Sequence, residues 1–195
     1  MSGQGETMAK FEAKLVGDAP LLMHSVRLLD KMSAQAKEMA AVTKKKQKTD
    51  DDMLTIKRLE WYAGIYTDET GRVAIPADNI LASVIEGARK AKLGKLAQAA
   101  VFETAAYYPL IYSGPKDLAA LYANGRFCDY RGVRNQQNRV MRSRPIFREW
   151  SCDISLIFNE TILDPAQLKQ ALEAAGEQVG IGDWRPRFGR FHVES

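Results

Sequence analysis

The sequence predicts an α+β fold built as one domain over residues 1–195, and three observations lead to that prediction. Residues 8–16 and 146–158 alternate apolar and polar side chains with the period of a half-buried strand. Residues 76–93 and 165–179 instead repeat apolar side chains at helical spacing. Hydrophobic residues make up 46% of the 195 residues and charged residues 27%, which is ordinary for a globular chain with a sizeable core. This length suits one elaborated domain or at most two small ones.

The first predicted elements are one strand and two helices. The strand at 8–16 carries apolar side chains on one face and charged ones on the other, and the Gly-Asp-Ala-Pro sequence at 17–20 ends it. Residues 26–66 follow a helical pattern twice, and a run of lysines followed by aspartates at 44–52 separates the two helices. The lysines stand at the end of the first helix and the aspartates at the start of the second, so both runs favour the helix dipoles.

The middle of the chain predicts a strand, a helix and a second strand. Residues 72–75 form a short strand, and Pro76 opens a helix that runs to about residue 93. Asp78 is the predicted N-cap of that helix. The aromatic and aliphatic residues of 100–112 predict the next strand. Residues 113–144 show little periodicity, which indicates a long loop or an extended hairpin.

The last third gives the clearest strand and the best-defined helix. The strand at 146–158 is followed by a helix with Asp164 as its N-cap and Pro165 at its first position. Gly180 ends this helix, and residues 191–193 form a last short strand. One face of the strand at 146–158 is predicted to be buried: Ile146, Trp150, Cys152, Ile154, Leu156 and Phe158.

With the early helices set aside, the order is strand, helix, strand, strand, helix, strand. This order predicts a ferredoxin-like (RRM-like) core, in which two helices cover one face of a sheet. Residues 26–66 then form a helical insertion, and residues 113–144 form an arginine-rich thumb-like loop. The two cysteines give neither a disulfide framework nor, with only two histidines, a metal cluster, which favours a reducing cytoplasm.

Arginine is concentrated in one segment of 23 residues, which contains a single acidic residue, Asp129, and no lysine. Guanidinium groups match phosphate oxygens and can stack on bases, and the amides at 135–138 can bond to sugars and base edges. This composition predicts a nucleic-acid-binding finger. The alternative is a solvated loop whose arginines pair with acids elsewhere. The arginines are Arg126, Arg131, Arg134, Arg139, Arg142, Arg144 and Arg148.

A second candidate site is the glycine-rich loop at 180–191, between a predicted helix and a predicted edge strand. Its glycines let the backbone approach a ligand, and Trp184 and Phe188 could stack on bases. The alternative is a helix C-cap whose aromatic residues fill the core. Three arginines of the loop could neutralise phosphates: Arg185, Arg187 and Arg190.

This loop resembles the glycine-rich loop of the RAMP superfamily, the ferredoxin-like RNA-binding subunits of CRISPR effector complexes. The sequence Ile75-Pro76-Ala77-Asp78-Asn79-Ile80 is also similar to the start of the first helix in their backbone subunits. Compact relatives encoded by phages and prophages look equally similar. The resemblance implies a palm-like core with a thumb hairpin and a helical insertion, assembling side by side along a strand.

Several other residues belong to the predicted site. Lys44, Lys45 and Lys46 could touch phosphates, although helix-dipole compensation explains them equally well. His24 and Arg27 could bind the nucleic-acid strand. In some RAMP proteins a histidine cleaves RNA as general base, so an endoribonuclease using His24 is an alternative, and the resemblance leaves a cleaving role for Asp30 open. The sequence holds no cofactor or catalytic motif, and we expect no cofactor, no metal and no enzymatic activity.

We therefore expect sequence-independent binding of single-stranded RNA or DNA, by cooperative assembly of a homo-oligomer or filament. Other CRISPR-like subunits are a further candidate partner. The formal net charge of +4 and the pI near 9.0 fit an anionic partner. No apolar run is long enough for a membrane helix, and the N-terminus has no secretion signal, so the expected location is the cytoplasm. A further alternative is a protein-interaction module that mimics or blocks a CRISPR complex.

Overall fold

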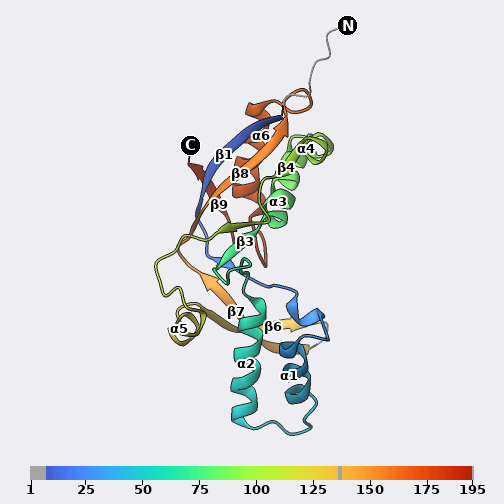
Figure 1. Ribbon diagram of the computed structural model, residues 1–195. Coiled ribbons are helices and arrows are strands. Elements are labelled where there is room, and N and C mark those ends of the chain that lie inside the picture. Colours follow the sequence, from blue (N-terminus) through green and yellow to red (C-terminus); the bar gives the residue numbers. More distant parts are fainter. Residues whose placement is uncertain (1–7, 136–137, 195) are drawn as a thin grey trace. The chain divides into compact units, whose positions relative to one another are not determined.

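The computed structural model describes residues 8–135 and 138–194 and divides the chain into two compact units (Figure 1). The first unit is made of the chain up to Leu21, Thr67–Ser113, and the chain from Arg148 onward. The second unit is made of Leu22–Tyr66 and Gly114–Phe147. The predicted helical insertion and the predicted thumb-like segment thus fall almost wholly in the second unit.

The first unit contains a four-stranded antiparallel sheet with the order β4-β8-β1-β9. Strands β1 and β4 are both antiparallel to β8 and flank it, while β8 and β9 are both antiparallel to β1 and flank that strand. Helix α3 lies in the chain between β1 and β4, and helix α6 lies between β8 and β9. The strands are β1 (Met8–Gly17), β4 (Val101–Glu103), β8 (Ser151–Asn159) and β9 (Phe191–Glu194).

Helices α3 and α6 pack against each other and cover one face of this sheet (Figure 1). A β-carbon at Gly87 of α3 would collide with the backbone carbonyl of Ala171 in α6, so glycine is what lets the helices approach this closely. None of the helices in the described part of the chain is long and apolar enough to cross a membrane. The helices of the first unit are α3 (Ala77–Lys90), α4 (Gly94–Ala100), α6 (Pro165–Ala174) and the π-helical turn η2 (Ala175–Val179).

Capping distinguishes the two main helices. Asp164 caps α6 in a capping box with Gln167, and Pro165 stands at the first helical position, so both expectations are confirmed. The predicted N-cap of α3 is wrong. Pro76 occupies the cap position, and Asp78 lies in the first turn, where its charge still favours the helix dipole.

The strand predicted at 100–112 is two short strands in different sheets. Strand β4 joins the main sheet, while β5 (Tyr107–Pro109) pairs with β3 (Ala74–Pro76). The hydroxyl of Thr104, which lies between β4 and β5, donates to the carbonyl of Ser155 over 2.9 Å. That bond ties the segment between β4 and β5 to β8, and the predicted strand is interrupted at this segment.

Strand β8 begins at residue 151, five residues later than predicted, because Trp150 turns the chain. Its indole donates to the carbonyl of Ala19 over 2.9 Å and fills the space beside Gly17. The apolar face expected after Trp150 is confirmed, since Cys152, Ile154, Leu156 and Phe158 are all buried. Residue Ile146 is also buried, but it belongs to β7. Both cysteines of the chain are free thiols.

The second unit combines helices with a three-stranded sheet of order β2-β7-β6. The two predicted helices of residues 26–66 are confirmed as α1 and α2, and the segment predicted as a loop or hairpin contains α5 and the β6–β7 hairpin. Trp61 of α2 is fully buried and donates to the carbonyl of Phe127 over 2.8 Å. The elements are β2 (Leu21–Leu22), η1 (Arg27–Leu29), α1 (Ala34–Thr43), α2 (Asp50–Gly64), α5 (Leu118–Ala123), β6 (Cys128–Asn135) and β7 (Asn138–Phe147).

Candidate nucleic-acid interface

The glycine-rich loop of the first unit is anchored at its base by hydrogen bonds to fixed elements. The buried hydroxyl of Ser83 in α3 donates to the carbonyl of Gly180 over 2.8 Å. The backbone N–H of Ile181 donates to Gly189, and that of Gly189 donates to Pro20, both over 2.9 Å. Gly189 has φ 72°, and a β-carbon there would collide with the carbonyl of Ile181, so only glycine fits. The loop is therefore held in one conformation at its base.

The tip of this loop presents a stack of one tryptophan, one phenylalanine and one arginine. The rings of Trp184 and Phe188 lie nearly parallel, with centroids 5.8 Å apart and an interplanar angle of 24°. The guanidinium carbon of Arg187 lies 5.3 Å from the centre of the Trp184 ring. Phe188 is buried, as the core-filling alternative expected, whereas Trp184 is 42% exposed. The buried ring thus supports an exposed one, which is an arrangement on which a base could stack.

A hollow of about 780 Å³ lies beside this stack, between the loop and the last turns of α3. Its charged lining residues are three cations and two acids. Arg89 and Lys90 of α3 are both exposed and contribute two of the cations, and the third is Arg185. The sequence reasoning missed Arg89 and Lys90, because basic residues in the last turn of a helix are common dipole partners and gave no separate signal. The acids are Glu86 and Asp183.

The arginine-rich segment of the second unit is mostly the β6–β7 hairpin, and its register divides the arginines between two faces. Arg131 lies opposite Arg142, and Asp129 lies opposite Arg144, all on one face. Arg134 lies opposite Arg139 on the other face. The predicted finger therefore has arginine on both faces. The predicted amide contacts involve Gln136 and Gln137, which lie outside the described residues.

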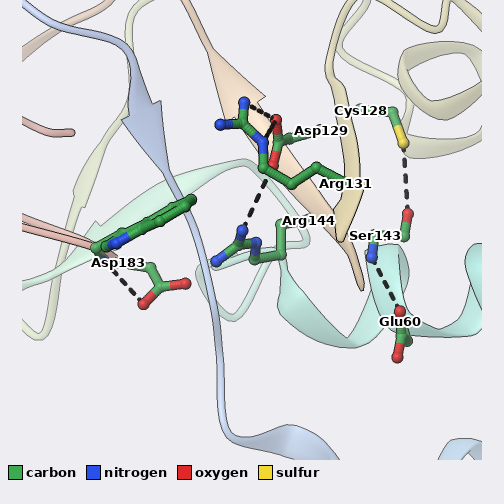
Figure 2. Close-up of polar contacts among 8 residues, drawn as sticks. Glu60, Cys128, Asp129, Arg131, Ser143, Arg144 and Asp183 are labelled. Atoms are coloured by element: carbon green, nitrogen blue, oxygen red, sulfur yellow. Dashed lines mark hydrogen bonds and ion pairs between the residues drawn. The ribbon is translucent and has the colours of Figure 1, made fainter. Parts of the chain in front are cut away.

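Asp129 holds two of these arginines (Figure 2). Its carboxylate is buried and accepts hydrogen bonds from the Nε and Nη2 atoms of Arg131. The Nη2 atom of Arg144 lies 3.5 Å from the other carboxylate oxygen, and the Arg144 side chain is only 9% exposed. An arginine this buried needs its counter-ion, so Asp129 and Arg144 form a structural pair.

Glu60 of α2 binds a third arginine and one backbone N–H of β7. Its carboxylate pairs with the Nη1 atom of Arg142. It also accepts the backbone N–H of Ser143 over 2.9 Å (Figure 2). The Glu60 side chain is 9% exposed and that of Arg142 is 43% exposed, so the charge of Arg142 is paired while its side chain stays partly accessible. The alternative, in which arginines pair with acids elsewhere in the chain, therefore describes Arg142, whereas Arg131 and Arg144 pair with the acid of their own segment.

The remaining arginines of the segment are exposed at different places. Arg134 and Arg139 are exposed on the hairpin. Arg126 is exposed before β6, and Arg148 is exposed in the first unit, after β7. Of the predicted contacts in the hairpin, that of Arg139 is one that a nucleic-acid strand could reach without breaking an ion pair among the described residues.

The lysine run between α1 and α2 has partly structural roles. Lys45 pairs with Asp52 of α2 over 2.6 Å, and the Lys48 ammonium donates to the carbonyl of Lys45 over 3.0 Å. Asp52 also closes a capping box with Thr49 in the first turn of α2. The predicted position of the aspartates at the start of this helix, where they favour its dipole, is therefore confirmed. Lys44 and Lys46 are exposed, and their predicted contacts with phosphates stay predictions.

His24 and Arg27 are exposed in the second unit, close to each other in sequence. The backbone carbonyl of His24 accepts the hydroxyl of Tyr66 over 3.1 Å, which fixes the chain there. Their predicted binding role and the alternative catalytic role of His24 stay predictions.

The uncovered face of the four-stranded sheet carries paired charges. Lys10 pairs with Glu12 over 2.6 Å, and Lys14 with Glu194 over 3.5 Å. Strands β1, β4, β8 and β9 contain no arginine. The cations of the first unit's candidate site are therefore on the glycine-rich loop and α3, and the sheet serves as their scaffold.

Comparison with known proteins adds no family to this description. A scan against protein-family models matched none of them to the chain, and a search of curated proteins found no significant match. The functional argument therefore depends on the residues described above.

Proposed function

We propose that this protein binds single-stranded RNA or DNA through its phosphates and bases, without reading the sequence, and that the glycine-rich loop of the first unit is the main contact. Arg185, Arg187 and Arg190 neutralise phosphates, and Trp184 stacks on a base. Arg89 and Lys90 extend the cationic surface along α3. The protein acts as a binding module and not as an enzyme.

The proposed core is ferredoxin-like. Two features support this. Helix α3 lies in the chain between the two strands that flank β8, and α6 lies between the two that flank β1; all neighbouring strands are antiparallel. The resemblance of the loop and of residues 75–80 to the RAMP superfamily then supports a strand-coating role. By analogy, copies assemble side by side along the strand, as in CRISPR backbone subunits or in a phage protein that coats a strand.

The observation that carries the proposal is the exposed Trp184 ring, supported from one side by buried Phe188 and flanked by Arg187. The anchored loop already holds this large exposed ring in place, so the protein loses little conformational entropy when a base binds to it. Base stacking on such a ring tolerates every base, because all bases have a π-face. Neighbouring guanidinium groups supply the phosphate contacts.

The test measures fluorescence anisotropy of labelled single-stranded RNA and DNA of equal length over a range of salt concentrations. Trp184→Ala should weaken binding by about 1 to 3 kcal/mol for all sequences alike. Replacing Arg185, Arg187 and Arg190 together with alanine should reduce the slope of log K against log salt by about 2, since each lost phosphate contact removes about 0.7.

The matched control replaces three exposed lysines of the same unit that lie outside the hollow, Lys92, Lys95 and Lys169, with alanine. This control removes the same net charge and should reduce the slope less. Equal effects of both triple variants would mean that net charge, and not the loop, holds the strand. Binding that does not strengthen with oligonucleotide length would contradict side-by-side assembly.

A further inference from the structure

A hollow on α1 in the second unit combines an apolar floor with a basic rim. Its volume is about 730 Å³. Leu28 and Met39 supply the large apolar side chains of the floor. Three lysines and no carboxylate line it. The complete lining is Leu28, Lys31, Ala36, Lys37, Met39, Ala40, Ala41, Thr43 and Lys44.

This hollow continues into a second one of about 350 Å³, because Leu28, Met39 and Thr43 line both. The second hollow adds three cations and one acid, Glu60, which is already paired with Arg142. The joined surface, which we call the α1 groove, is therefore apolar inside and positively charged around. The residues added by the second hollow include Lys48, Met53, Ile56, Lys57, Tyr130, Val140, Met141 and Arg142.

Two large apolar side chains that follow Leu28 closely in the chain are strongly exposed. Leu29 is 76% exposed and Met32 is 75% exposed, and both lie on the short segment that also contributes Leu28 to the groove. Large apolar side chains that gather next to a hollow are typical of surfaces that another molecule covers.

We propose that the α1 groove binds an acidic amphipathic helix of a partner protein. The charge of the groove favours an acidic ligand. Lys31, Lys37 and Lys44 form no ion pair with the described residues, so they suit carboxylates on the polar face of the ligand. Its floor requires leucine-like side chains at helical spacing, and the thioether of Met39 adapts to their shape. The alanines at 36, 40 and 41 are small enough to let a helix backbone approach α1.

The lining of the larger hollow favours a peptide over a nucleic acid. Base stacking uses aromatic rings or guanidinium planes, and the residues that line this hollow include neither. The floor is aliphatic, and its cations are lysines, which act as point charges that suit carboxylates spaced along a helix. The smaller hollow does contain one ring and one guanidinium group, but both already have partners within the groove. The guanidinium of Arg142 is paired with Glu60, and the ring of Tyr130 faces the ammonium of Lys57 at 4.8 Å.

The probe for the test is a fluorescein-labelled synthetic peptide of about 16 residues, long enough to form a helix on binding. It carries leucines on one helical face and glutamates on the others. A scrambled peptide of the same composition, which has no apolar face, and a version with lysines in place of glutamates serve as controls. Anisotropy is measured with the full-length protein.

The variant Lys31→Glu/Lys37→Glu reverses two exposed charges on the rim and should weaken binding of the amphipathic peptide by roughly tenfold or more. Its matched control is Lys95→Glu/Lys169→Glu, which changes the net charge equally at exposed positions of the first unit. Ala41→Glu places a carboxylate in the floor at an exposed helical position and should have the same effect. Thermal melting checks that each variant is folded.

Binding of the amphipathic peptide alone, lost in both groove variants and kept in the control, supports the proposal. Failure of that peptide to bind better than the scrambled one overturns it, as does equal loss in the control variant. Two other results also overturn it. One is loss of oligonucleotide binding on Lys31→Glu/Lys37→Glu without any peptide binding, which assigns the groove to nucleic acid. The other is loss of a dimer in sedimentation without peptide binding, which assigns it to a second copy of this chain.

Discussion

At the scale of single residues, the carboxylate of Asp129 separates the structural arginines of the hairpin from the exposed ones. Replacing Asp129 with alanine should lower the free energy of unfolding by about 3 to 5 kcal/mol, because it leaves the buried Arg144 guanidinium without its counter-ion. Urea denaturation measures this change. Arg139→Ala, at an exposed position of the same hairpin, is the control and should change stability by no more than about 0.5 kcal/mol. Similar losses in both variants would contradict the assignment.

The same residues decide how the binding site can be tested. Alanine at Arg144 or Arg142 removes one member of a structural ion pair, so weaker binding in such a variant would report on folding as well as on contact. Arg139→Ala avoids this problem, because the side chain of Arg139 makes no ion pair or hydrogen bond with the described residues. The position of each arginine in the register therefore matters more than its presence in the run.

At the scale of elements, the packing of α3 on α6 depends on Gly87. Helix propensity alone predicts that Gly87→Ala stabilises α3 by about 1 kcal/mol. The collision of the new β-carbon with the backbone of Ala171 and Ala175 predicts the opposite sign, a loss of about 1 to 3 kcal/mol. Urea denaturation gives the sign directly. Ala82→Gly, at an exposed position of the same helix, should cost about 1 kcal/mol by propensity alone. A stabilised Gly87→Ala variant would show that the helices are not this close.

At the scale of the whole molecule, one aspartate in each unit ties stability to pH. The hydroxyl of Thr70 and then the backbone N–H of Arg72 lower the pKa of Asp68 to about 2. The ammonium of Lys45 and then the backbone N–H of Thr49 lower the pKa of Asp52. Because both pKa values lie below the unfolded value of about 3.8, the stabilisation is complete above pH 4 and is lost as the pH falls toward 2.

The measurement is the free energy of unfolding between pH 5 and pH 2. It should fall below pH 4 in the unaltered protein and fall less steeply in Asp52→Asn and Asp68→Asn, which have no proton to bind there. Thr70→Val removes the hydroxyl donor to Asp68 and should move the acid transition to higher pH. An unchanged pH profile in all three variants would exclude these carboxylates as the source of acid sensitivity.

The features that the sequence predicted correctly are those set by residues close together in the chain. The alternation of β1, the capping box that begins α6 and the glycine that ends the following turn are each set by residues within a few positions. The sequence also located the glycine-rich loop. It placed the start of β8 too early, because the indole of Trp150 is bound to Ala19, far away in the chain.

The sequence by itself determined the α+β class, most helices and strands, and the two segments in which arginine gathers. Only the tertiary structure decided which arginines are paired, since Glu60 meets Arg142 across 82 positions of the chain. It also decided that Arg89 and Lys90 share a hollow with Trp184, and that the two predicted insertions make up one compact unit. The physical reason is that side-chain pairing and hollows arise from contacts between distant segments, which leave no periodic pattern in the sequence.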